Sequence, residues 1–158
     1  ALNRKKIMID LAHINEKGFW EVADLTDAPL VATHSNAWEL CNSARNLTNR
    51  QLKAIGESGG VAGLNFHVGF LSRDGNFQND VPLSVMVDHI EHMVDVAGID
   101  SVALGSDFDG CQVSSELKDA AGLPGLMAAI KARGYSDADL TKIAHGNWLR
   151  VLKETWGE

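Results

Sequence analysis

Four short apolar runs, with helical patterns between them, constrain the fold of this chain more than any other feature. They cover residues 7–12, 30–33, 61–66 and 102–104. Each run is apolar almost throughout, which is typical of strands buried on both faces and not of half-exposed antiparallel strands. Strands of this kind alternating with helices predict a parallel α/β fold.

Helix signals fill the intervals between the runs. Thr48 and Gln51 have the spacing of a capping box, Ser136 and Asp139 form a weaker version of it, and Gly98 is a typical helix stop. The expected helices cover residues 15–23, 48–59, 86–97, 124–133 and 136–156. The pattern is therefore four strand–helix units with closing helices, in one domain over residues 1–158.

A polar residue follows or ends each apolar run. These residues are His13, His34, Asn65 (with His67 close behind) and Asp107. Functional groups gather at the carboxyl ends of the strands in a (β/α) barrel, so this layout predicts about half of such an eight-stranded barrel. A flavodoxin-like open sheet is the alternative, but the chain lacks the glycine-rich phosphate loop expected after an early strand.

Composition and charge narrow the classes of function. The net charge of −7 argues against a nucleic-acid surface, and no apolar run approaches the roughly 20 residues of a membrane helix. Cys41 and Cys111 are too few for a disulfide framework and are expected to be free thiols in a reducing cytoplasm. The chain starts at Ala1 and soon enters its first apolar run, as a fragment or a processed product would.

His13 and His34 are candidate metal ligands. They end neighbouring strands, about 5 Å apart, so both imidazoles could reach one ion at the same rim. Imidazole nitrogen is a favoured zinc ligand, and a further ligand would complete a catalytic site with an open position. Asp107, two strands further on, could accept and relay a proton from a metal-bound water.

An ordered set of motifs spans nearly the whole chain. The motifs are Ile9–His13, Ala32–Asn36, Arg45–Leu47, Asp88–His92, Gly105–Gly110 and Gly146–Val151. This set resembles the membrane (renal) dipeptidase family of zinc metallopeptidases. The resemblance implies the amidohydrolase-type (β/α)8 TIM barrel, of which this chain would be the C-terminal half.

The resemblance implies a role for each candidate residue. His13 and His34 match the two histidines that bind the second zinc of a binuclear pair. Asp107 matches the carboxylate that takes a proton from the metal-activated hydroxide and delivers it to the leaving amine. Arg45 matches the arginine that holds the C-terminal carboxylate of a dipeptide substrate, and Asn65 lies beside the substrate.

The chain also departs from the family pattern. The family binds its first zinc through a His-x-Asp pair and bridges both metals with a glutamate, but no His-x-Asp occurs in this sequence. With only the two histidines as ligands, the isolated chain is expected to be inactive and to need an N-terminal half-barrel. A cytoplasmic location and a homo-oligomeric state are expected as well.

Two alternatives remain open. The first is another hydrolase of the same barrel type, which acts on a lactone or a cyclic amide and has no use for Arg45. The second is a non-catalytic half-barrel that pairs with another chain. Of the other polar residues, His89 and His92 lie on a helix body and are expected to make structural hydrogen bonds, and Asn147 is expected to tie the C-terminal helix to the barrel.

Overall fold

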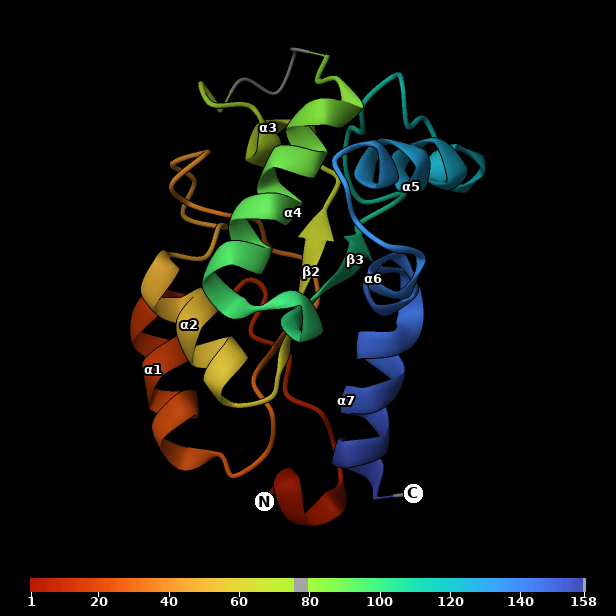
Figure 1. The fold of residues 1–158 in the computed structure, drawn as a ribbon. Helices are drawn as coiled ribbons and strands as arrows, with labels where there is room; N and C mark the ends of the chain where they lie inside the picture. The colour runs from red at the N-terminus through yellow and green to blue at the C-terminus, as the bar shows by residue number, and fades with distance from the viewer. Residues whose placement is uncertain (76–79, 158) are drawn as a thin grey trace.

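Three parallel strands form the centre of the structure, a computed structural model that describes residues 1–75 and 80–157 (Figure 1). Figure 1 shows the strand arrows pointing away from the end of the molecule where both termini lie. In chain order the elements are η1 (Asn3–Lys5), α1 (Glu16–Leu25), β1 (Val31–Ala32), α2 (Asn49–Glu57), β2 (Val61–Asn65), α3 (Val68–Leu71), α4 (Leu83–Ala97), η2 (Ile99–Ser101), β3 (Val102–Ser106), η3 (Ala120–Gly122), α5 (Leu123–Ala132), α6 (Asp137–Thr141), η4 (Lys142–Gly146) and α7 (Asn147–Trp156).

The sheet has the order β1-β2-β3, with every pair parallel, so the predicted α/β class is confirmed. The first apolar run differs from its prediction as a full strand, because only Asp10 bridges to Val31 of β1. The carboxylate of Asp10 accepts a hydrogen bond from the backbone N–H of Thr33 at 2.9 Å. Without this bond, the N–H of Thr33 would be free to pair with the backbone of the first run and extend the sheet. A polar side chain inside the run thus ends the pairing that its apolar neighbours predict.

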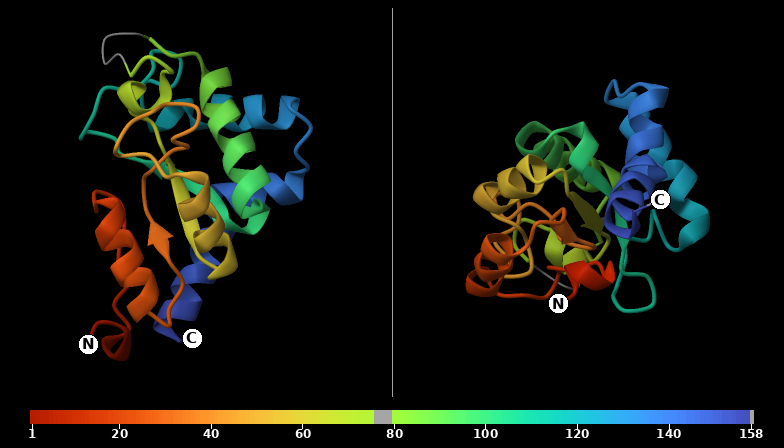
Figure 2. Two further views of the ribbon diagram at one scale, coloured as in Figure 1. Left: turned by 90° about the vertical axis from the view of Figure 1, so that its left-hand side faces the viewer. Right: turned by 90° about the horizontal axis from the view of Figure 1, so that it is seen from below.

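Helices α1, α2, α4 and α7 follow one another in an arc around the strands when the molecule is viewed from below (Figure 2). The core lies between this arc and the sheet. It includes Leu52 of α2, Leu64 of β2 and Ile90 of α4, each with no exposed surface. Burial of such side chains, each worth about 1.5–3 kcal/mol, holds the helices against the strands.

The helix bounds follow the predicted caps closely except near the C-terminus. The capping box of Thr48 and Gln51 starts α2, and Gly98 ends α4. The predicted single helix over residues 136–156 is instead divided into α6, the π-helical turn η4 and α7. Asn147, which follows that turn, donates from Nδ2 to the carbonyls of Ile99 and Val102, both at 2.8 Å. Among the described residues, no helix is long and apolar enough to span a membrane.

A close backbone contact joins the carboxyl ends of all three strands. A Cβ atom on Gly63 of β2 would lie 2.1 Å from the carbonyl oxygen of Thr33 and 2.8 Å from the Cα of Gly105 in β3. A Cβ atom on Gly105 would lie 2.2 Å from the same oxygen. β1 and β3 are separated by β2 in the sheet, so this three-way contact requires strong curvature, which only glycine permits at both positions.

We predict that Gly63→Ala destabilises the protein by about 1–3 kcal/mol, because the new methyl group collides with backbone that cannot move aside without flattening the sheet. Gly125→Ala is the matched control, since its new Cβ would meet only Leu83 Cδ1 at 3.7 Å and alanine is favoured in helix α5. Urea unfolding measures both. Equal stabilities for the two variants would contradict the contact as a constraint on the sheet.

Candidate functional site

His13 and His34 face each other at the carboxyl ends of the first run and β1. Their Nε2 atoms are 2.9 Å apart, and their ring centroids are 5.0 Å apart at an interplanar angle of 65°. His13 has a left-handed backbone, with φ of 70°, which is uncommon outside glycine. The two imidazoles that the sequence predicts as metal ligands are therefore brought to one point through the same ring nitrogen.

The electrostatic surroundings keep His13 neutral. Desolvation, together with the positive charges of Arg45 and His34, lowers the pKa of His13 below its ordinary value of 6.5. Asp107 and Asp10 act in the opposite direction but with a smaller effect. A neutral imidazole is the form that binds a metal ion, so these surroundings favour ligation at neutral pH.

Asp107 follows the last residue of β3 and is held by Asn65. Asn65 is fully buried, and its Nδ2 atom donates to Oδ2 of Asp107 at 3.0 Å. Ser106 and Asp107 both have left-handed backbones, with φ of 60° and 78°. Strained backbone of this kind is common where a fold positions a functional side chain. The structure thus places the predicted proton carrier beside the predicted substrate residue Asn65.

Arg45 belongs to a segment that we call the Arg45 loop, residues 35–48. Its Nε and Nη2 atoms are buried and have no hydrogen-bond partner among the described residues. Its Cζ atom lies 5.2 Å from the ring centroid of Phe70. Burial lowers the pKa of Arg45, against the opposing effect of Asp107 and Asp10. Arg45 and His13 also line one cavity of about 220 Å³, so the arginine lies beside His13.

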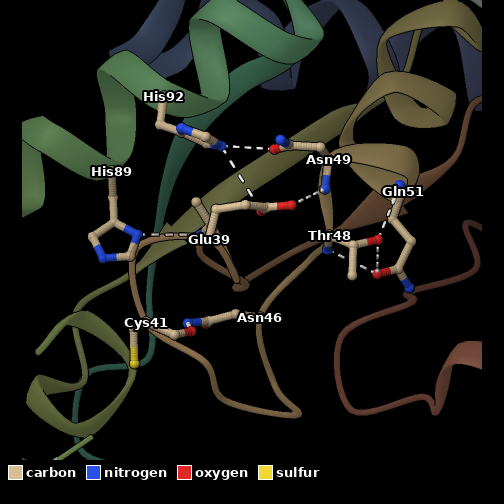
Figure 3. Close-up of polar contacts among 9 residues, drawn as sticks. Glu39, Cys41, Asn46, Thr48, Asn49, Gln51, His89 and His92 are labelled. Carbon is tan, nitrogen blue, oxygen red and sulfur yellow. Dashed lines mark hydrogen bonds and ion pairs between the residues drawn. The ribbon is translucent and has the colours of Figure 1, made fainter. Parts of the chain in front are cut away.

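Helix α4 fixes the Arg45 loop through the two histidines that the sequence assigns to structural hydrogen bonds (Figure 3). His89 is fully buried, accepts the N–H of Ala37 at Nδ1 over 3.2 Å, and donates from Nε2 to the carbonyl of Leu71 over 3.1 Å. His92 Nε2 lies 2.7 Å from Oδ1 of Asn49, the residue that directly follows the loop. The expectation of a structural role is confirmed for both.

Two buried asparagines hold the loop from inside. Asn46 donates from Nδ2 to the carbonyls of Cys41 and Phe70, both at 2.9 Å. Asn36 accepts the N–H of Asn65 at 2.8 Å and donates to the carbonyl of the same residue at 3.0 Å. We did not predict these roles, because polar residues after a strand end are ordinary loop residues in a sequence pattern. Their burial, visible only in the structure, distinguishes them.

His67 and Asp109, which lie near the ends of β2 and β3, make contacts other than with the histidine pair. His67 packs its ring against Phe70, with centroids 4.5 Å apart, and its Nδ1 lies 3.2 Å from the carbonyl of Gln112. Asp109 is exposed and has a left-handed backbone, as in a turn. No group of three or more His, Cys, Asp or Glu side chains in the described parts of the chain could hold a metal ion. The imidazoles of His13 and His34 fit a metal ion as two of its ligands.

Comparison with known proteins is consistent across sequence and structure. A family profile described as membrane dipeptidase, peptidase family M19, matches residues 1–156. A Klebsiella pneumoniae protein, described as uncharacterized and encoded in the region 5′ of pqqA, is 51% identical over 98% of this chain and 57% of its own length. A dipeptidase from Claviceps purpurea is 31% identical over 97% of this chain and 36% of its own length.

Solved structures give the same result for the fold. One is described as a dipeptidase and metallopeptidase of family M19, with a TM-score of 0.97 and 48% identity over 99% of this chain and 46% of that one. Another is a metallopeptidase from Rhodobacter sphaeroides bound to a phosphinate mimic of the dipeptide L-Ala-D-Ala, with a TM-score of 0.96 and 49% identity over 98% and 44% of the two chains. The chain spans about half the length of these proteins.

His89 should make stability depend on pH. Burial lowers its pKa from 6.5 to about 4 in the folded protein, so the unfolded chain binds more protons between these pH values. The contribution of neutral His89 is complete above about pH 6.5 and is lost as pH falls to about 4, which amounts to about 3 kcal/mol. His89→Gln can keep both hydrogen bonds but cannot bind the extra proton.

We therefore predict that the wild type loses stability relative to His89→Gln, by up to about 3 kcal/mol, as the pH falls from about 6.5 to about 4. Urea unfolding at a series of pH values measures it. A difference that stays constant over this range would show that His89 does not gain a proton on unfolding.

Proposed function

The chain belongs to the membrane dipeptidase family, peptidase family M19, and we propose that it forms the C-terminal half of a zinc-dependent dipeptidase. Its relatives include dipeptidases of the metallopeptidase class. The observation that carries the proposal is the 2.9 Å approach of His13 Nε2 to His34 Nε2, beside the carboxylate of Asp107 and the guanidinium of Arg45. Metal ligation, proton transfer and substrate binding each have a candidate group at this one rim.

His13 and His34 would hold the zinc ion of a binuclear site that this chain contributes to. Zinc supplies Lewis acidity and lowers the pKa of a water molecule bound to it. The chain's own part is to present two imidazoles in a fixed arrangement. The lowered pKa of His13 supports this role, because it favours the uncharged imidazole that can bind a metal ion.

Asp107 is the proposed proton carrier of the reaction. Hydrolysis of a peptide bond needs a group that removes a proton from the attacking water and returns one to the leaving amine. The hydrogen bond from Asn65 Nδ2 occupies one lone pair of Oδ2 and orients the carboxylate. The other carboxylate oxygen, Oδ1, is the one we assign to proton transfer.

Arg45 is the proposed site for the C-terminal carboxylate of the dipeptide. A guanidinium and a carboxylate form two parallel hydrogen bonds, which fix the orientation of the substrate as well as its position. The buried Nε and Nη2 atoms support this role, since donors buried without a partner are costly unless a ligand satisfies them. The same argument favours a dipeptide over a lactone or a cyclic amide.

The rest of the site must come from another segment or another chain. Two metal ligands are too few for a catalytic zinc site. A homo-oligomer stays a prediction, but it cannot supply the missing His-x-Asp ligands that the family uses. The free thiols Cys41 and Cys111 support a cytoplasmic location.

We predict that this chain with added zinc does not hydrolyse L-Ala-D-Ala, because its half-site cannot hold the metal. A chimera in which this chain replaces the matching part of the Klebsiella pneumoniae relative should hydrolyse it in a zinc-dependent manner. The assay measures release of free alanine, and the chimera carrying His13→Ala and His34→Ala is the control. Robust turnover by the chain alone would contradict the need for a second half.

We predict that Arg45→Ala in the active chimera raises KM for a dipeptide by roughly 100-fold, because two charge-assisted hydrogen bonds to the substrate carboxylate are lost. A dipeptide amide, which lacks that carboxylate, should be hydrolysed equally by the variant and the parent. Arg45→Lys keeps the positive charge but loses the paired donors, so its KM for the dipeptide should lie between those of the parent and Arg45→Ala. An equal loss for both substrates would argue against carboxylate recognition.

A further inference from the structure

Asp10, Thr33 and His34 are connected by hydrogen bonds on the side of the His34 ring that faces away from His13. Thr33 Oγ1 lies 2.7 Å from Nδ1 of His34 and 2.6 Å from Oδ2 of Asp10. The other carboxylate oxygen of Asp10, Oδ1, accepts the backbone N–H groups of Thr33 at 2.9 Å and Ala12 at 3.0 Å. Asp10 is thus held by the backbone on one side and contacts the threonine hydroxyl on the other.

The chemistry of the three groups decides which of them donates and which accepts in each hydrogen bond. A carboxylate only accepts, so the single hydroxyl proton of Thr33 points to Asp10. The hydroxyl oxygen must then accept from His34, which places the imidazole proton on Nδ1. The Nε2 atom of His34 is left with a lone pair, which faces His13 and can accept a hydrogen bond from the Nε2 atom of His13 at 2.9 Å.

We propose that Asp10 and Thr33 are positioning residues that lock His34 in the tautomer with the proton on Nδ1, so that Nε2 is ready to bind metal. This inference rests on the proposed metal role of His34. A hydrogen bond to the ring nitrogen that does not bind the metal commonly fixes the tautomer and ring orientation of a metal-binding histidine. In this site the threonine hydroxyl connects the histidine to its carboxylate.

The same contacts position the two histidines relative to each other. Asp10 bridges to Val31, and the N–H of Leu11 donates to the carbonyl of Val31 at 2.7 Å, which ties the first run to β1 just before both histidines. Asp10 therefore aligns the strand end that carries His13 with the one that carries His34. One carboxylate controls both the spacing of the imidazoles and the tautomer of one of them.

Asp10→Asn tests the proposal sharply. The amide keeps an oxygen for the N–H groups of Ala12 and Thr33, but its NH₂ group donates to Thr33 Oγ1 where the carboxylate accepted. The hydroxyl proton of Thr33 must then turn to His34 Nδ1, which reverses the tautomer and puts a proton on Nε2. Thr33→Ser keeps the hydroxyl and is the matched control, while Thr33→Val removes it.

The tautomer is read directly from the ¹⁵N chemical shifts of the His34 ring in the metal-free chain, at about pH 8 where imidazole is neutral. We expect the Nδ1–H form in the wild type and in Thr33→Ser, a shift toward Nε2–H in Asp10→Asn, and a loss of preference in Thr33→Val. Thermal unfolding verifies that each variant is folded. A wild type in the Nε2–H form, or an unchanged tautomer in folded Asp10→Asn, would overturn the proposal.

Zinc affinity of the active chimera, measured by calorimetry, separates this inference from the proposed function. Asp10→Asn is expected to weaken zinc binding roughly 10- to 100-fold, as for other residues that orient metal ligands. If the parent chimera binds no zinc, the proposed function fails. The ring tautomers of the variants still test whether Asp10 and Thr33 set the tautomer of His34. If zinc binds equally tightly to the parent chimera and to its Asp10→Asn variant, Asp10 and Thr33 do not position His34 for metal binding.

Discussion

The contact of the Thr33 carbonyl oxygen with Gly63 and Gly105 is the constraint on which the candidate site depends. It brings three strand ends together although β2 separates β1 from β3 in the sheet. A flatter sheet would spread the residues that follow these ends. The curved one lets Asn65 reach Asp107 on one side and the carbonyl of His34 on the other, at 3.0 and 3.4 Å.

Much of this arrangement could be predicted from the sequence, because it depends on periodic patterns. Buried apolar runs ending in polar residues indicated parallel strands and placed His13, His34 and Asp107 at one rim. The extent of the first strand could not be predicted, because Asp10 diverts the N–H of Thr33 to a side chain. The π-helical turn η4 could not be predicted either, since no spacing distinguishes it from an ordinary helix.

The supporting contacts of the site were also beyond the sequence pattern. The roles of Asn36 and Asn46 depend on burial and on partners far along the chain, which local spacing does not encode. For His89 the sequence predicted structural hydrogen bonds but not their partners. These residues satisfy backbone groups within this chain, so the Arg45 loop is ordered by contacts that the chain itself supplies. The candidate site is therefore organised locally, although the described residues contain no group of three or more His, Cys, Asp or Glu side chains that could hold a metal ion.

The left-handed backbones of His13, Ser106 and Asp107 have a consequence for protein engineering. Glycine would relieve the strain at each position, so a selection for thermal resistance alone should favour replacing the imidazole and the carboxylate. At these positions, thermal stability therefore favours glycine, whereas the proposed function requires the imidazole and the carboxylate. Mutant libraries that are selected for thermal stability should therefore keep these three residues unchanged.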